Sequence, residues 1–352
     1  MHMAEVTDIL GEEVAVVPRA VKPPSGTSPA RHALPLRIPT MPMPSRLLVF
    51  PGLLACLLLG ACSRPAPPTS VTLRKTFRTA LKEAPTQHVS APTPPADLFE
   101  VVRYPAPLGS NAAYITPVRE GGKRPAVVWI HGGFNWGLDD FAWAPAPRDN
   151  DQSARAFREA GLVLMLPSLR GSDDNPGARE YFLGEVDDVV AAIDFVAQRS
   201  DVDPARVYVA GHSTGGTLAL MAAVLSPRLK GAYAFGPVED VSGYGHYVPL
   251  LGRVTGPELW MRNPVSFVEH LRVPTQVIEG ADRGNTGAFE PLRTAAKSAP
   301  LSFLEVPGAT HFNVLAPVTE LLARKLMDAK AEAPPVRLTD AEVREVVSAE
   351  QE

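Results

Sequence analysis

Cysteine is nearly absent from this sequence. The 352 residues contain two cysteines, Cys56 and Cys62, and both lie in one apolar segment. The rest of the chain therefore excludes a disulfide framework and any cysteine-based metal site. A basic excess is also missing, because 34 Lys and Arg stand against 38 Asp and Glu, for a net charge of −4. With no basic stripe, the sequence predicts no nucleic acid among its partners.

The first hundred residues are unusually rich in proline. They contain 16 of the 37 prolines, which predicts a poorly ordered N-terminal region before a compact domain. The total length allows one large α/β domain or two ordinary ones. We expect residues 1–40 to be a disordered or untranslated extension, since Met41 and Met43 are well placed as start residues for a signal peptide.

Residues 41–62 read MPMPSRLLVFPGLLACLLLGAC. Arg46 precedes an apolar run of 13 residues, too short for a helix that spans ~30 Å of hydrocarbon, which needs about 20 residues. This pattern is typical of a cleaved signal peptide. Its ending, "LGAC", resembles the lipobox of bacterial lipoproteins, which implies that residues 41–61 are a lipoprotein signal peptide and that Cys62 carries the lipid. The alternative is an apolar core segment with an incidental cysteine.

A Pro-rich tether and lead-in, residues 62–97, would then connect the lipid to the folded domain. A lipid-anchored protein of the cell envelope is the expected location, with the membrane as a partner through Cys62. By resemblance to lipoproteins, Ser63 after the cysteine implies the periplasmic face of the outer membrane if the cell is Gram-negative.

Strand-like and helix-like runs alternate from about residue 98 onward. Helical crossovers from the third strand on predict a mostly parallel sheet of eight strands, covered by helices on both faces, in the α/β class. We assign residues 98–330 to this domain and 331–352 to a tail with a short helix, which a capping box begins. Residues 237–273 interrupt the alternation as an insert. The predicted strands are 98–107, 111–118, 124–133, 162–168, 206–211, 230–237, 274–280 and 301–308.

The stretch VYVAGHSTGGTLAL contains a Gly-x-Ser-x-Gly motif centred on Ser213. Such a match is weak alone, but here a strand precedes it and a helix follows it, as a nucleophile elbow requires. The backbone N–H of Thr214 would lie at the start of that helix, where it can donate to an oxyanion with support from the helix dipole. Ser213 is therefore the candidate nucleophile.

A serine nucleophile needs a base, and the base needs an orienting acid, in the chain order Ser, acid, His. Among the later histidines, His311 follows the last predicted strand and is the candidate base, whereas His246 precedes the acid and His270 is expected on a helix surface. The acid is expected to be Asp282, in the loop after residues 274–280. Glu279 is the alternative, although its strand position indicates a buried or edge role.

A second oxyanion donor is expected in the "HGGF" loop after the third strand. Glycine allows the backbone to approach a substrate oxygen closely. The N–H of Gly133 is the first candidate and that of Phe134 the second, and His131 is expected to orient the loop. An ordinary tight turn is the alternative interpretation of this motif.

These motifs together resemble a known family. Residues 98–328 are similar to the α/β-hydrolase superfamily, and most similar to the catalytic domain of the prolyl oligopeptidase (S9) family and to dienelactone-hydrolase-like esterases. The matching stretches are HGGF, LRGSDDNPG, DVDPARVYVAGHSTGG, NPVSFVEHLRVPTQVIEGADRGN and GATHF. The resemblance implies an α/β-hydrolase fold, with Ser213 as nucleophile, His311 as general base and Asp282 as its orienting acid.

We therefore expect a membrane-anchored serine hydrolase that cleaves an ester or amide bond through an acyl-enzyme, without metal or organic cofactor. A small ester is the first expected substrate. The alternatives are an S9-like peptidase acting on short peptides and a non-catalytic envelope lipoprotein that binds a partner. Only roughly 35 residues separate Cys62 from the first predicted strand, too few for the β-propeller of prolyl oligopeptidases.

Overall fold

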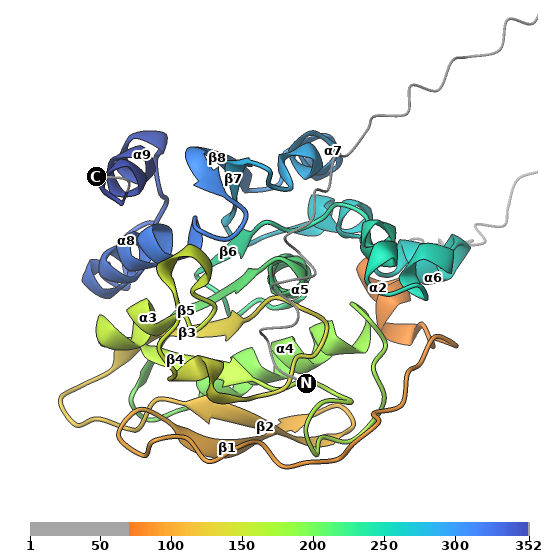
Figure 1. Ribbon diagram of the computed structural model, residues 1–352, viewed down its shortest axis with the longest axis horizontal. Coiled ribbons are helices and arrows are strands. Elements are labelled where there is room, and N and C mark those ends of the chain that lie inside the picture. The colour runs from red at the N-terminus through yellow and green to blue at the C-terminus, as the bar shows by residue number, and fades with distance from the viewer. Residues whose placement is uncertain (1–69, 351–352) are drawn as a thin grey trace, which may run out of the picture. The chain divides into compact units, whose positions relative to one another are not determined.

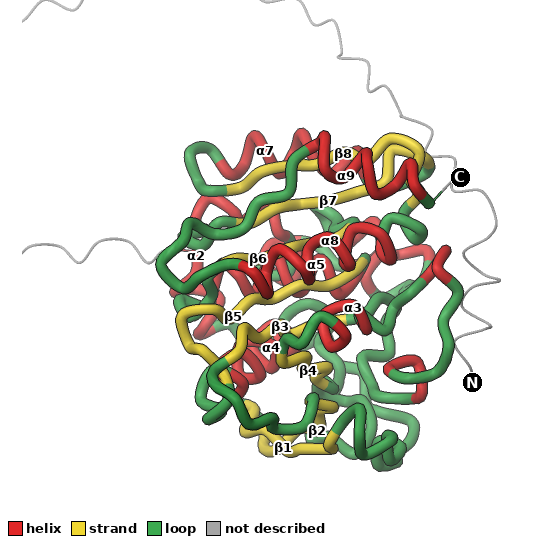
Figure 2. The backbone as a smooth tube through the Cα atoms, turned by 90° about the vertical axis from the view of Figure 1, so that its left-hand side faces the viewer, coloured by secondary structure: helices red, strands yellow, loops and turns green. Residues whose placement is uncertain are grey.

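The computed structural model describes residues 70–350, which contain one eight-stranded sheet (Figure 1). The strand order is β1-β2-β4-β3-β5-β6-β7-β8, and Figure 2 shows this succession from one edge to the other. β1 pairs antiparallel with β2 and β2 with β4, whereas all other pairs are parallel. The predicted mostly parallel sheet of eight strands is confirmed. The strands are β1 (Glu100–Ala106), β2 (Gly109–Ile115), β3 (Arg124–Ile130), β4 (Val163–Pro167), β5 (Val202–His212), β6 (Gly231–Phe235), β7 (Thr275–Asp282) and β8 (Leu301–Thr310).

Helices cover both faces of the sheet and create two separate hydrophobic cores. On one face lie α4 (Gly184–Val196), α5 (Thr214–Leu225) and α7 (Phe289–Ala296). The other face is covered by α3 (Arg155–Glu159), α8 (Leu315–Asp328) and α9 (Asp340–Ala349). Because both faces are buried, the central strands read as nearly continuous apolar runs.

Side-chain alternation along β3 divides its residues between the two cores. Val128 and Ile130 join the core under α4 and α5, whereas Val127 and Trp129 join the core under α8. This is the period of two that a strand imposes.

The helix α5 is apolar all round because it is enclosed on nearly every side. All residues from Thr214 to Ala223 are buried. A helix without a polar face belongs inside a protein rather than on its surface. The segment that begins with the residue after Ser213 is thus held firmly in the core.

The helix α2 (Ser70–Thr76) was not expected from the sequence, because it falls within the predicted tether and lead-in. Arg74 of α2 donates to the side chain of Asp187 at 2.9 Å and to the carbonyl of Leu183, both at the start of α4. Because these contacts are tertiary, the local sequence of α2 carries no signal for them.

The lead-in also contacts the insert, which contains 3₁₀ turns and the helix α6 (Gly256–Trp260). Thr79 Oγ1 and the backbone N–H of Ala80 both donate to Glu258 of α6, at 2.7 and 2.9 Å. Within residues 70–350 no helix is both long and apolar enough to cross a membrane. The predicted signal peptide and lipidation site at Cys62 lie outside the described residues.

The tail carries α9, whose N-terminus has the capping box predicted at Thr339 and Glu342. The Glu342 N–H donates to the Thr339 hydroxyl, and the Glu342 carboxylate accepts the Thr339 N–H at 2.9 Å.

The parallel strands bring their carboxyl ends to one edge of the sheet. β3 ends one residue before His131, β5 ends one residue before Ser213, and β8 ends one residue before His311. In open α/β sheets this edge is where ligands bind. The predicted site segments therefore meet in space although they are far apart in the chain.

Candidate active site

Ser213 occupies a strained turn between β5 and α5. Its φ is 55° and its ψ is −116°, a conformation that costs a residue with a side chain about 1–3 kcal/mol. The two glycines of the motif make the turn possible. A Cβ on Gly211 would overlap the carbonyl of Gly215, and a Cβ on Gly215 would overlap that of Ile130. The strand, turn and helix of the predicted elbow are present.

The two backbone N–H groups predicted as oxyanion donors lie on segments that meet at this turn. Gly133 has φ +90°, and its carbonyl accepts a hydrogen bond from the Thr214 hydroxyl, which ties the "HGGF" loop to the start of α5. Within residues 70–350 the N–H groups of Gly133 and Thr214 donate to no backbone or side-chain acceptor. These two amides lie on the loop and the helix start that this hydrogen bond joins.

His131 holds the shape of this loop. Its ring nitrogens lie 2.7 Å from the carbonyl oxygen of Gly132 and 3.1 Å from that of Gly137. Burial lowers the pKa of His131, although both carbonyls favour its charged form. Its contacts agree with the expected role in orienting the loop.

His311 is paired with Glu279 rather than with Asp282. The distance from His311 Nδ1 to Glu279 Oε2 is 2.8 Å, and the Glu279 side chain is fully buried. The same carboxylate accepts the backbone N–H groups of Gly280 at 2.7 Å and Asn285 at 2.9 Å. Because a carboxylate accepts, the proton of His311 lies on Nδ1, which leaves the Nε2 lone pair free to take a proton.

The expectation that Asp282 orients His311 is wrong in this geometry. Asp282 is exposed at the end of β7, beyond a register shift that follows Gly280. A Cβ on Gly280 would overlap the carbonyl of Thr310, so β8 passes directly against this point of β7. Because β8 approaches β7 at Gly280, His311 lies beside Glu279. Asp282 lies two residues beyond that point on β7.

Gly236 makes room for the His311–Glu279 pair. It follows β6 with φ +56°, and a Cβ there would overlap the His311 ring and lie 2.5 Å from Glu279 Oε2. The preceding carbonyl, that of Phe235, accepts the N–H of Ser213 at 2.7 Å. The end of β6 therefore positions both Ser213 and His311, although no motif in the sequence marked it.

An aromatic wall adjoins Ser213 on the side of the insert. The hydroxyl of Tyr244 lies 3.0 Å from Thr217 Oγ1 on α5. Burial raises the pKa of this hydroxyl, while hydrogen bonding to Thr217 and Ser213 opposes the rise. The Tyr244 ring stacks on Phe182 and meets Phe134 edge to face, with centroid distances of 5.3 and 5.4 Å.

Phe182 belongs to a strained turn that a buried polar cluster supports. Tyr181 and Phe182 have φ of 49° and 64°. The Glu185 carboxylate accepts the N–H groups of Glu180 and Tyr181, at 2.6 and 3.0 Å. Buried Arg262 donates through Nε to the carbonyls of the same two residues, at 3.0 and 2.9 Å.

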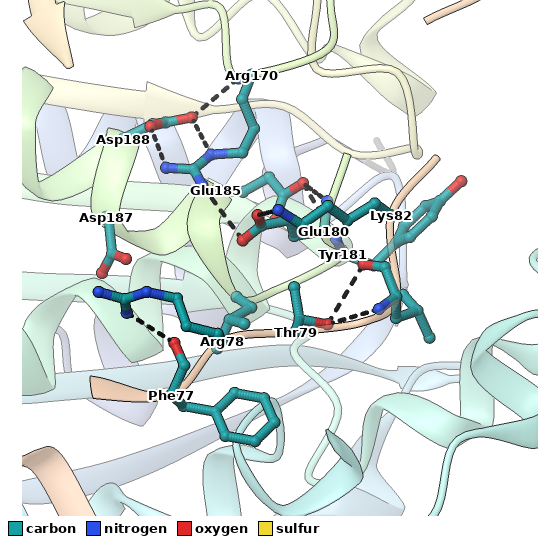
Figure 3. Close-up of polar contacts among 12 residues, drawn as sticks. Phe77, Arg78, Thr79, Lys82, Arg170, Glu180, Tyr181, Glu185, Asp187 and Asp188 are labelled. Carbon is teal, nitrogen blue, oxygen red and sulfur yellow. Dashed lines mark hydrogen bonds and ion pairs between the residues drawn. The ribbon is translucent and has the colours of Figure 1, made fainter. Parts of the chain in front are cut away.

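Arg170 holds the other side of this polar cluster. Its guanidinium donates twice to Asp188, at 2.8 and 3.0 Å, and once to Glu180, at 3.2 Å (Figure 3). Asp188 also accepts the backbone N–H of Arg170 at 2.9 Å. Among the described residues, no group of three His, Cys, Asp or Glu side chains is arranged to hold a metal ion.

Comparison with known proteins finds a similar family and similar folds. Residues 149–258 match the prolyl oligopeptidase family, Peptidase_S9. A puromycin-hydrolyzing peptidase of Mycobacterium tuberculosis superimposes with a TM-score of 0.53 at 19% identity, over 66% of this chain and 40% of its own. A hyperthermophilic esterase of Pyrobaculum calidifontis superimposes with a TM-score of 0.50 at 20% identity, over 66% and 86%. The chain has the α/β-hydrolase fold. The predicted resemblance to the prolyl oligopeptidase family is confirmed.

A curated relative of this α/β-hydrolase chain is an uncharacterized protein of Mycobacterium tuberculosis. The two are 30% identical over 204 residues, which cover 55% of this chain and 66% of the relative. The chain thus spans 66% of that relative and 40% of the puromycin-hydrolyzing peptidase. The match to the prolyl oligopeptidase family supports the expectation of a serine hydrolase.

The buried Glu185 predicts a pH-dependent stability. Burial raises its pKa from 4.5 to about 7, against two backbone N–H groups and the Arg170 charge. Between pH 4.5 and 7 the folded chain keeps a proton that the unfolded chain loses, so the free energy of unfolding falls as the pH rises. Glu185→Gln removes this titration. Between pH 4.5 and 8, the free energy of unfolding of the variant should rise by about 3 kcal/mol relative to that of the wild type.

Chemical denaturation at a series of pH values measures this difference. Glu345→Gln is the matched control, because Glu345 is exposed on α9. Its free-energy difference from the wild type should stay constant over the same pH range. A constant difference for Glu185→Gln as well would show that Glu185 ionises normally in the folded chain.

Proposed function

We propose that this chain is a serine hydrolase that cleaves an ester bond through an acyl-enzyme. The observation that carries the proposal is the hydrogen-bonded Glu279–His311 pair, which lies against Gly236. The carbonyl of Phe235, the residue before Gly236, accepts the backbone N–H of the strained Ser213, so the end of β6 holds both parts. A nucleophile, a base and an orienting carboxylate in that relation are the parts that acyl transfer requires.

Each group has a defined part in the reaction. Ser213 Oγ attacks the carbonyl carbon and its proton passes to His311 Nε2, since Nδ1 already carries a proton held by Glu279. The N–H groups of Thr214 and Gly133, with Phe134 as the alternative donor, stabilise the oxyanion. His311 then returns the proton to the leaving alcohol. Water, activated by His311 in the same way, releases the acid and restores Ser213.

Hydrolysis of a small ester is the first proposed activity, and hydrolysis of an amide is the second. The rings of Phe134 and Tyr247 are 6.1 Å apart at the edge of the aromatic wall, where Tyr247 is partly exposed. An apolar acyl or alcohol group fits such a surface. Peptidase activity on short peptides is the second candidate, because the matched family model is one of peptidases.

A fluorophosphonate probe tests whether Ser213 is a nucleophile. The wild-type chain should be labelled on Ser213 and should hydrolyse p-nitrophenyl acyl esters. Ser213→Ala should lose labelling and at least about 10³-fold in kcat. Ser348→Ala is the matched control, because Ser348 is exposed on α9.

The same assay separates the alternatives. Turnover of aminoacyl-naphthylamides at a rate comparable to the esters would place the peptidase activity first. A folded wild-type chain that is neither labelled nor active would instead favour the non-catalytic binding protein.

Two amide substitutions distinguish the candidate acids. Both Glu279 oxygens accept N–H groups, so the amide of Glu279→Gln would set one donor against another and disturb the tautomer of His311. We expect kcat to fall about 10³–10⁴-fold. Asp282→Asn, at an exposed position, should keep wild-type kcat. A loss of kcat in Asp282→Asn with wild-type kcat in Glu279→Gln, each variant folded by its melting temperature, would restore Asp282 as the orienting acid.

We also propose that Cys62 carries the lipid that anchors the chain in the cell envelope. This rests on the sequence of residues 41–62, and the described fold is compatible with it, because α2 starts at Ser70. The seven intervening residues, 63–69, reach at most about 25 Å, which would keep the domain close to the membrane. The proposed location is the periplasmic face of the outer membrane if the cell is Gram-negative.

Mass spectrometry of the native N-terminal peptide tests the anchor. The expected result is a mature chain that begins at Cys62 and carries acyl groups. An unmodified peptide that runs through Cys62, with residues on both sides, would exclude it.

A further inference from the structure

A continuous chain of hydrogen bonds connects three loops of the candidate site. The backbone N–H of Gly132 donates to Gln152 Oε1 at 3.1 Å. Gln152 Nε2 lies 2.8 Å from His212 Nδ1, and His212 Nε2 lies 2.9 Å from the carbonyl oxygen of His311. The chain runs from the "HGGF" loop, through the residue before Ser213, to the loop of the candidate base.

The direction of every bond in this chain is determined. A carbonyl only accepts, so the proton of His212 lies on Nε2 and its Nδ1 must accept. Gln152 therefore turns its NH₂ group to His212 and its oxygen to the N–H of Gly132. Asn150 Oδ1 accepts the second proton of that NH₂ group at 2.8 Å. Flipping the amide of Gln152 would set donor against donor at Gly132.

The side chains of Gln152 and His212 are buried and fixed by their surroundings. Gln152 is 6% exposed and His212 is 1% exposed. The Gln152 carbonyl accepts the indole N–H of Trp129 at 3.0 Å, which fixes its backbone to β3. A Cβ on Gly132 would lie 3.1 Å from His212 Nδ1, so the loop backbone rests directly on the imidazole ring.

His212 suits this role because it is held neutral. Burial lowers its pKa well below the ordinary value, and the nearby rings of His311 and His131 lower it further. These two histidines are the titratable groups that face it, and the hydrogen bond to the His311 carbonyl opposes the lowering. A protonated His212 would present an N–H to the NH₂ group of Gln152 and break the chain.

We propose that Gln152 and His212 are positioning residues that set the oxyanion loop and His311 at a fixed separation around Ser213. The proposal rests on the proposed function. An oxyanion donor and a proton acceptor must both lie within a few tenths of an ångström of the reacting atoms, and a displacement of 1 Å costs about 10²-fold in rate. Neither residue touches the substrate.

Kinetic measurements on variants of the full-length protein test whether the Gly132–Gln152–His212–His311 hydrogen bonds, called the bridge below, position the site. Gln152→Met keeps the length of the side chain and removes its hydrogen bonds to Gly132, His212 and Asn150. Its kcat should fall about 10- to 100-fold while KM stays within about twofold, because the loss falls on the transition state. Gln198→Met is the matched control, since Gln198 is exposed and donates only to a local carbonyl.

A second variant probes the two ends separately. In His212→Asn the amide oxygen replaces Nδ1 and still accepts from Gln152, while the donor to the His311 carbonyl is lost. It should also lower kcat, and combining it with Gln152→Met should lower kcat no further than the worse single variant, since the two act as one unit. His88→Asn, at an exposed position, should leave kcat unchanged.

Hydrogen exchange provides a readout that does not need activity. The N–H of Gly132 should exchange faster in Gln152→Met than in the wild type at an unchanged melting temperature. Unchanged kcat in the folded Gln152→Met variant, or additive losses in the double variant, would overturn the proposal. A wild type that hydrolyses no ester would overturn the proposed function alone. The bridge would be overturned independently by a Gln152→Met variant in which hydrogen exchange at the Gly132 N–H is unchanged.

Discussion

Backbone contacts that leave no room for a Cβ atom hold the candidate site together. Gly215 rests against the carbonyl of Ile130, Gly280 against that of Thr310, and Gly236 against His311 and Glu279. Each contact joins two segments that are distant in the chain. Because the first two separations are set by backbone atoms in close contact, and the third by the glycine backbone against the two side chains, these side chains can make hydrogen bonds of defined length.

Conformational strain concentrates around the same edge of the sheet. Ser213, Tyr181 and Phe182 all have positive φ, which costs about 1–3 kcal/mol each. The enclosed helix α5 holds the first, and the polar cluster around Arg170 and Glu185 holds the other two. A buried ion pair adds little net stability, yet losing one partner costs several kcal/mol. The cluster therefore selects one conformation of the turn more than it stabilises the fold.

The fold and the nucleophile elbow at Ser213 were predictable from local sequence patterns. Apolar runs and turn residues predict the eight strands, and the Gly-x-Ser-x-Gly setting predicts the elbow. The choice between Glu279 and Asp282 was not predictable, because it depends on how closely β8 approaches β7 at Gly280. The bridging role of Gln152 was not predictable either, since its partners at Gly132 and His212 come from other parts of the chain.

Two neighbouring histidines show how such distant contacts divide chemical roles. The rings of His212 and His311 are 4.5 Å apart, yet their protons lie on different nitrogens. The carboxylate of Glu279 draws the proton of His311 to Nδ1, and the carbonyl of His311 draws that of His212 to Nε2. During acyl transfer His311 would become a cation that Glu279 stabilises. A charged His212 at this distance would repel that cation, so its neutrality serves the base as well as the bridge.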